Sequence, residues 1–192
     1  MIKKQIKDIQ KIIDKFFCIE KIQVTSGYAQ EIPVYNISTC DLLKVLAFLK
    51  NSKESRFTIL TDLFGADFPE NENRFEVVYN LLSIEYNVRI IVKVRVPDAV
   101  EIPSIASLFS AATWYEREVF DMFGVVFTYS PDQRRILTDY GFVGHPLRKD
   151  FPLSGHVQVK YDDKLCQVIY EPVKLDEEFR NFDLSPRWHG NT

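Results

Sequence analysis

The chain has 192 residues, of which 46% are hydrophobic and 14% are aromatic, and its formal net charge is −3. This is enough for one folded domain with its own core, or for one domain with an extension. The slightly acidic balance argues against a nucleic-acid-binding surface. No apolar run approaches the roughly 20 residues that a membrane-spanning helix needs, so we expect membrane association only through a partner.

The first predicted elements are a helix and two short strands. Apolar residues recur at helical spacing through residues 2–16, with lysines between them, which predicts an amphipathic helix packed on the core. A helix lying on a membrane surface is the alternative, because lysines line its polar side. Strand-like runs follow at residues 21–25 and 32–37. A second helix is expected over residues 40–50, with Ser38 or Thr39 as its cap.

A period of two begins near residue 56 and continues to residue 96. It marks three runs, at residues 57–63, 75–82 and 88–96, and in the last run every even position is valine or isoleucine. Short turns separate the runs, which predicts an antiparallel meander. Two helices on one face would complete an α+β fold, a two-layer sandwich of a mainly antiparallel sheet with helices on one face.

A third helix is predicted over residues 110–123, with Gly124 as its left-handed C-terminal cap. On such a helix the apolar residues form one stripe, while Arg117, Glu118 and Asp121 share another face. Arg117 and Asp121 are four residues apart, so they can form an ion pair.

Strong periodicity ends at about residue 126, although residues 157–161 and 166–170 look like strands. The stretch still contains many aromatic residues, and loops of this length are uncommon in a compact domain. We therefore divide the chain into an α+β core at residues 1–126 and a long extended C-terminal segment at residues 127–192. We expect this segment to dock on another protein through its rings. The alternative is that it folds back over its own sheet.

Charged residues are concentrated between Glu116 and Asp150, where five cations and six anions indicate an ion-pair network. A catalytic interpretation, a stand-alone metal-dependent hydrolase, would use Glu116, Glu118, Asp121 and His145. No metal-binding spacing supports it, and Glu116 and Glu118 diverge on a helix. For His145 a structural bond, such as one to a backbone carbonyl, is the safer expectation.

The three cysteines, Cys18, Cys40 and Cys166, are far apart in the chain and form no CxxC pair. The sequence therefore offers no local ligand set for zinc or an iron–sulfur cluster, and we expect three reduced, partly buried thiols. The GxxG fragment at residues 141–144 lacks a following lysine, so it is not a phosphate-binding loop.

Several blocks of sequence resemble the 30 kDa subunit family of NADH:quinone oxidoreductase, which is respiratory complex I. The most specific are EREVFDMFG at residues 116–124, RRIL at 134–137 and YGFVGHPLRKDFPL at 140–153. The block RFEVVYNLLS at residues 74–83 is similar to the central strand of that family. The chain departs from the family pattern at Ser130, Gln158 and Lys160, and also in its ending, SPRW at residues 185–188.

The resemblance implies a non-catalytic structural subunit of the peripheral arm, without a bound cofactor. Its neighbours carry electrons from NADH to ubiquinone, coupled to proton translocation. The implied partners are the hydrogenase-like large subunit and the neighbouring iron–sulfur subunits. We expect the partner-binding and structural residues to be Glu116, Arg117, Glu118, Asp121, Arg134, Arg135, His145, Arg148, Lys149 and Asp150. Abundant Ile, Lys, Asn and Phe suggest AT-rich coding, which fits an organelle-encoded mitochondrial copy or a bacterial one. We expect a location on the matrix side of the mitochondrial inner membrane. The cytoplasmic side of a bacterial membrane is the alternative.

Overall fold

The computed structural model describes residues 20–23 and 32–175, and the predicted helix at residues 2–16 lies outside these ranges. The chain forms two compact units, one extending to Phe151 and the other beginning at Pro152. Each unit is described by itself below.

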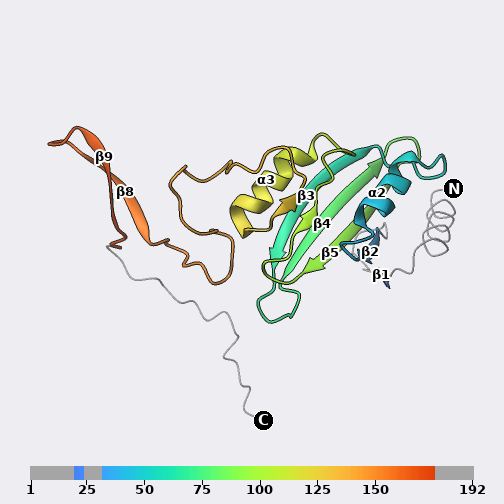
Figure 1. The fold of residues 1–192 in the computed structure, drawn as a ribbon, viewed down its shortest axis with the longest axis horizontal. Coiled ribbons are helices and arrows are strands. Elements are labelled where there is room, and N and C mark those ends of the chain that lie inside the picture. The colour runs from blue at the N-terminus through green and yellow to red at the C-terminus, as the bar shows by residue number, and fades with distance from the viewer. Residues whose placement is uncertain (1–19, 24–31, 176–192) are drawn as a thin grey trace, which may run out of the picture. The chain divides into compact units, whose positions relative to one another are not determined.

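The first unit is built on a five-stranded sheet with the order β1-β2-β5-β4-β3 (Figure 1). β3, β4 and β5 pair antiparallel in succession, which confirms the predicted meander. β1 pairs antiparallel with β2, and β2 pairs parallel with β5, a connection that was not predicted. The bounds are β1 Glu20–Gln23, β2 Pro33–Ile37, β3 Ile59–Asp67, β4 Phe75–Ser83 and β5 Val88–Val96.

Helix α2 (Leu42–Asn51) covers one face of this sheet. Its buried positions follow the helical period and are Leu42, Val45, Leu46 and Leu49. The residue before the helix is Asp41, whose side chain makes no capping bond, so the prediction of Ser38 or Thr39 as the cap was wrong. The helix depends on its packing rather than on a cap, because each buried leucine contributes about 1.5–3 kcal/mol.

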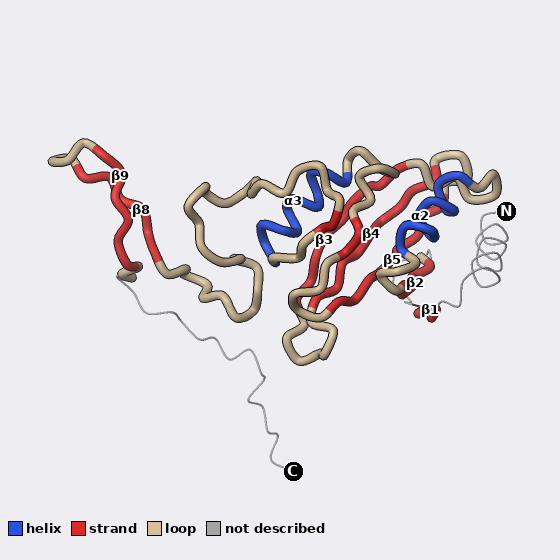
Figure 2. The backbone as a smooth tube through the Cα atoms, viewed as in Figure 1, coloured by secondary structure: helices blue, strands red, loops and turns tan. Residues whose placement is uncertain are grey.

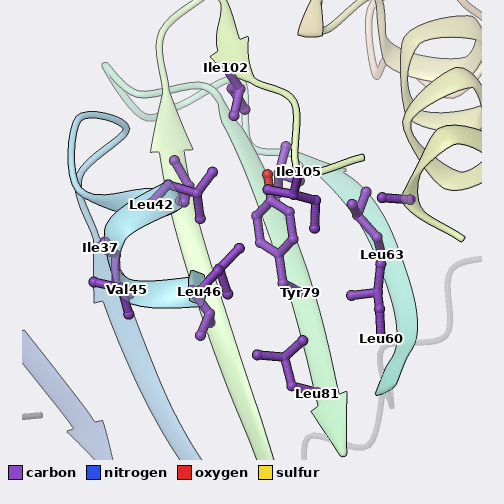
Figure 3. Close-up of a cluster of buried hydrophobic side chains, with 14 of the residues drawn as sticks. Ile37, Leu42, Val45, Leu46, Leu60, Leu63, Tyr79, Leu81, Ile102 and Ile105 are labelled. Atoms are coloured by element: carbon purple, nitrogen blue, oxygen red, sulfur yellow. The ribbon is translucent and has the colours of Figure 1, made fainter. Parts of the chain in front are cut away.

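The core lies between the sheet and the helices. On β5 the even positions from Val88 to Val96 are all buried, whereas Arg89 and Arg95 are exposed, as the alternation predicted. Figure 3 shows the ring of Tyr79 between Leu46 of α2 and Leu63 of β3. The predicted α+β sandwich, a mainly antiparallel sheet with helices on one face, is therefore confirmed.

Helix α3 (Ala112–Phe123) packs beside β3 and ends at Gly124, which adopts the predicted left-handed conformation with φ 78°. The approach to β3 is close, because a Cβ atom at Gly65 would lie 2.8 Å from the ring of Phe123. Two short strands on either side of α3, β6 (Ile102–Pro103) and β7 (Phe127–Thr128), pair in parallel. As Figure 2 shows, the chain from β7 to β8 is a loop.

The second unit contains an antiparallel hairpin of β8 (Val157–Asp162) and β9 (Gln167–Pro172), at the positions that looked like strands. Residues paired across the hairpin share a face. One face therefore carries only apolar residues, namely Val157, Val159, Tyr161, Val168, Tyr170 and Pro172. The opposite face is mostly polar and includes a bond of 2.6 Å from Gln158 Nε2 to Glu171 Oε1.

Two of the three cysteines lie in the described residues. Cys40 and Cys166 are free thiols, and both are exposed. The expectation of partly buried thiols was therefore wrong for these two, because one precedes α2 and the other lies in the hairpin turn.

Candidate functional site

The C-terminal end of α3 is covered by residues 145–148, which return from the following loop. The last turn of a helix leaves backbone carbonyls without partners. Here His145 Nδ1 lies 3.0 Å from the carbonyl of Asp121, and the backbone N–H of Leu147 donates to Met122 over 3.1 Å. Since a carbonyl only accepts, Nδ1 carries the proton, and the bond to a backbone carbonyl that was expected of His145 is present.

Arg148 also covers the end of α3, and its position shows why a glycine is needed directly after the helix. Its Nε donates to the carbonyl of Phe123 over 2.6 Å. The positive charge of Arg148 is also stabilised there by the negative end of the helix dipole. A Cβ atom on Gly124 would lie 2.7 Å from the His145 ring and 2.8 Å from Arg148. Gly124 is therefore needed twice, for its positive φ and for the space that the returning loop occupies.

Asp121 binds a second part of the loop. Its Oδ2 accepts the backbone N–H groups of Ile136, Leu137 and Thr138 at 2.8–3.1 Å. Its Oδ1 accepts from Arg135 at 2.7 Å and from the Thr138 hydroxyl at 2.5 Å. We call this set, Asp121 with residues 135–138, the Asp121 clasp.

The Asp121 clasp favours a charged carboxylate. Burial alone would raise the pKa of Asp121, but the hydrogen bonds from Thr138 and Leu137 and the bond from Arg135 outweigh it. The pKa therefore lies well below its usual range, and the side chain is fully buried as an anion. The predicted network of ion pairs in this region is present in part: Arg117 and Arg134 pair with Asp132, and Arg135 pairs with the fully buried Asp121.

Arg117 does not pair with Asp121, although the helical spacing allows that ion pair. Its guanidinium donates to the carbonyls of Arg134 and Arg135 at 2.8 and 3.0 Å and lies 3.5 Å from Asp132. A helical pair four residues apart is worth only about 0.2–0.5 kcal/mol. Arg117 gains more stabilisation from two backbone carbonyls and the Asp132 carboxylate than from a single pair with Asp121. Asp121 in turn is already bound to Arg135 and to residues 136–138.

A second cluster joins the loop to the sheet. Asp67, at the end of β3, binds Arg74 through two bonds of 2.7 and 2.8 Å and accepts the backbone N–H of Lys149 at 2.7 Å. Arg74 also lies 3.0 Å from Asp150, and Arg148 lies 3.2 Å from Asp98. We call Asp67, Arg74 and residues 148–150 the Asp67 clasp.

The charges in the Asp67 clasp stabilise one another. The bond from Arg74 lowers the pKa of Asp67 against the opposing effect of burial, and the bond from Lys149 lowers it further. Bonds to Asp67 and Asp150 raise the pKa of Arg74. Asp67, Arg74 and Asp98 were not among the predicted residues, because their partners lie far along the chain and no local pattern marks them.

Glu116 of α3 is buried and pairs with no cation among the residues that the structure describes. Its carboxylate accepts the hydroxyl of Ser104 at 2.7 Å and the backbone N–H of Ile105 at 2.8 Å. Burial raises the pKa of Glu116 despite these bonds. Burial and the Glu116 charge together raise the pKa of Tyr79, whose hydroxyl lies beside Ile105 in Figure 3.

The four residues of the hydrolase interpretation do not form one site, because three of them bind separate partners and the fourth faces solvent. Glu116 binds the segment near β6, Asp121 binds residues 135–138, and His145 binds a backbone carbonyl. Glu118 is exposed. Within residues 20–23 and 32–175, no group of three or more His, Cys, Asp or Glu side chains is placed to hold a metal ion. Nothing in this arrangement supports a hydrolase.

The remaining predicted residues fall into two groups. The backbone N–H of Lys149 takes part in the Asp67 clasp. The backbone carbonyls of Arg134 and Arg135 accept from Arg117, and the Arg134 side chain pairs with Asp132 at 2.7 Å. The side chains of Arg134 and Lys149 are exposed. Of the positions that depart from the family pattern, Ser130 donates to the carbonyl of Asp132 at 3.2 Å. Their role in binding a partner stays a prediction.

Known proteins match this chain over most of its length. The family model for the respiratory-chain NADH dehydrogenase 30 Kd subunit matches residues 35–157. Proteins named as the C subunit of NADH-quinone oxidoreductase are similar to it. The Rickettsia felis protein is 54% identical over 181 residues, covering 94% of this chain and 87% of its own length. The Rickettsia bellii protein is 54% identical over 184 residues, covering 96% and 94%.

Similar proteins also occur in other bacteria. The protein of the same name from Chelativorans sp. is 55% identical over 150 residues, which cover 78% of this chain and 75% of that protein. In the part of the chain that the structure describes, no helix combines the length and the apolar character needed to cross a membrane. On these matches, the chain belongs to the family of the 30 kDa subunit of respiratory-chain NADH dehydrogenase.

Proposed function

We propose that this chain is a non-catalytic structural subunit of the peripheral arm of respiratory complex I. In this role it holds neighbouring subunits in position while they pass electrons from NADH to ubiquinone and the complex translocates protons. Membership of the 30 kDa family supports the proposal. The charged residues of α3 and its loop support it as well, because most of them bind backbone groups and so fix the geometry of the loop.

The observation that carries the proposal is the apolar face of the β8–β9 hairpin. Five apolar residues of this face are 54–63% exposed, namely Val157, Val159, Tyr161, Val168 and Tyr170. An isolated two-stranded hairpin is marginally stable in water. A contiguous exposed apolar face of this kind marks a protein interaction site. The hairpin therefore gains its stability by packing against another subunit.

The loop before the hairpin supplies further contact residues. The two clasps fix its backbone, while apolar side chains remain exposed at Leu137, Tyr140, Val143 and Leu147. In this proposal residues 1–126 form the core and residues 127–192 form the docking segment. Arg117, Asp121, Arg135, His145 and Arg148 shape that segment, because rigid presentation of apolar anchors lowers the entropy cost of association.

We further propose the hydrogenase-like large subunit as the main partner, with the neighbouring iron–sulfur subunits beside it. Association with the membrane then comes only through the assembled complex. In this proposal the chain lies on the matrix side of the mitochondrial inner membrane or on the cytoplasmic side of a bacterial membrane. The relatives described above are bacterial, which supports the bacterial location.

The experiment compares two neighbouring hairpin positions that face opposite ways. Val159→Asp places a charge on the apolar face, whereas Lys160→Asp places the same residue on the polar face. Membranes from cells that express each full-length variant are solubilised and separated on a native gel, and co-migrating subunits are identified. We expect wild type and Lys160→Asp to migrate with the other complex I subunits and Val159→Asp to be lost. A wild-type chain that migrates alone would contradict the proposal.

A further inference from the structure

The outer side of α3 carries two exposed side chains beside the Asp121 clasp. Trp114 is 62% exposed, and Glu118, one helical turn further on, is exposed as well. Arg117 and Asp121 lie on the same side of the helix and bind residues 134–138. This segment therefore follows α3 for one turn, and Trp114 and Glu118 border it.

Glu118 differs from the other acidic residues of this region in its lack of a partner. Asp121 accepts five hydrogen bonds in its clasp, and Asp132 pairs with Arg134 and Arg117. The Glu118 side chain makes no hydrogen bond or ion pair with any residue that the structure describes. The two arginines nearby are already neutralised by Asp132, so the Glu118 carboxylate is an available negative charge.

Two exposed apolar side chains, Trp114 and Leu137, lie on α3 and on the segment bound to Asp121. The guanidinium of Arg117 lies 5.4 Å from the centre of the Trp114 ring, which fixes the orientation of the ring while most of it stays exposed. Leu137 is 62% exposed, and its backbone N–H is bound to Asp121 at 2.8 Å. An aromatic ring and a carboxylate one turn apart are thus presented on one side of α3, and the segment bound to that side carries the exposed Leu137.

We propose that Trp114, Glu118 and Leu137 form a binding surface for an arginine side chain of another protein in complex I. This inference rests on the function proposed above and names the chemistry of one contact. A guanidinium forms two parallel bonds with a carboxylate and stacks on an aromatic ring, and its aliphatic stem packs on apolar groups. Residues four apart on a helix lie about 5–6 Å apart at Cβ, so one side chain reaches both Trp114 and Glu118.

The first test compares charge reversal at Glu118 with charge reversal at an exposed site elsewhere. We expect Glu118→Lys to lower the amount of full-length chain in the assembled complex by roughly tenfold or more, because the arginine loses its partner and meets a like charge. Trp114→Ala lowers it as well. The matched controls are Glu70→Lys and Ile84→Ala, in turns of the sheet, and both assemble as wild type does.

Folding defects are separated from docking defects by the isolated chain. The thermal unfolding midpoint of Glu118→Lys should equal that of wild type, because the side chain has no partner among the described residues. If Glu118→Lys assembles as Glu70→Lys does, the inference is wrong and the proposed function stands. If the wild-type chain does not migrate with other subunits, the proposed function fails first.

The second test identifies the occupant directly. A photoreactive amino acid replaces Trp114 in the full chain, and the assembled complex is irradiated and its cross-linked peptides are sequenced. We expect a peptide from another protein of the complex with an arginine close to the cross-linked residue. Cross-links confined to this chain, or to a peptide without a nearby arginine, would overturn the inference.

Discussion

The carboxylate of Asp67 accepts the backbone N–H of Lys149 over 2.7 Å, although 82 residues separate them in the chain. The Asp67 side chain has no exposed surface and also binds Arg74 through two hydrogen bonds. A single buried carboxylate thus joins the end of β3, the start of β4 and the loop that follows α3. The position of that loop depends on the sheet beneath it.

Replacing Asp67 should destabilise the core. We expect Asp67→Asn to lower the free energy of unfolding by about 2–3 kcal/mol, because it removes charged hydrogen bonds and leaves Arg74 with only exposed partners. Urea denaturation of the full chain measures this change. Asp98→Asn, in the same network but half exposed, should cost less than about 1 kcal/mol. Equal losses of unfolding free energy for the two variants would show that the burial of Asp67 does not determine its contribution to stability.

The Asp121 clasp should be sensitive to both substitution and acid. We expect Asp121→Asn to lower the free energy of unfolding by about 3–5 kcal/mol, since Arg135 is left without its buried partner. The folded-state pKa of Asp121 is depressed, so its contribution is present above the unfolded value and is lost as the pH falls through the folded value.

Urea denaturation below about pH 4 tests this dependence on acid. Stability of the wild-type chain should fall more steeply there than that of Asp121→Asn, which has no carboxylate at this position to protonate. Parallel pH profiles for the two proteins would count against a charged Asp121 in the folded state.

Gly124 offers a test of the loop's return over the helix end. Alanine at this position meets a positive φ and two side chains at 2.7–2.8 Å, so Gly124→Ala should lose about 1–3 kcal/mol. Gly141→Ala is the matched control, because an added Cβ there has nothing within 4 Å. Thermal unfolding compares the two. If both variants unfold at the same temperature, residues 145–148 do not cover α3 as described.

Glu116 should give the opposite pH dependence to Asp121. Burial raises its folded-state pKa, so its contribution to stability is fully present below the unfolded value and is lost as the pH rises through the folded value. Glu116→Gln keeps an acceptor for Ile105 and a donor for Ser104. We expect the variant to lose less stability than wild type between about pH 4.5 and pH 7. Chemical denaturation across that range measures the difference, and an unchanged profile would contradict it.

Local patterns were enough to predict most elements of the fold. The alternation from Val88 to Val96 and the helical spacing with Gly124 at its end each concern neighbouring residues, and both were confirmed. The parallel pairing of β2 with β5 was not predicted, because strand patterns carry no information about which distant strand is adjacent. The Asp67 clasp was missed for the same reason.

The charged loop shows where spacing misleads. Arg117 and Asp121 stand at the helical distance for an ion pair, yet each binds backbone groups of the 134–138 segment. When the helix is considered alone, the possible partners of Arg117 are only the residues one turn away on that helix. Once a second segment lies along the helix, its carbonyls and N–H groups compete for the same side chains, and they win because several bonds form together.

The parallel partnership of β2 and β5 has a consequence for how the protein is made. β2 leaves the ribosome early, but roughly fifty residues must follow before its partner β5 exists, and closing so long a loop costs entropy before any contact forms. The β3–β4–β5 meander, whose strands are adjacent in sequence, is able to form first. β2 then joins a completed template, and folding of this chain should be limited by that late addition at the edge of β5.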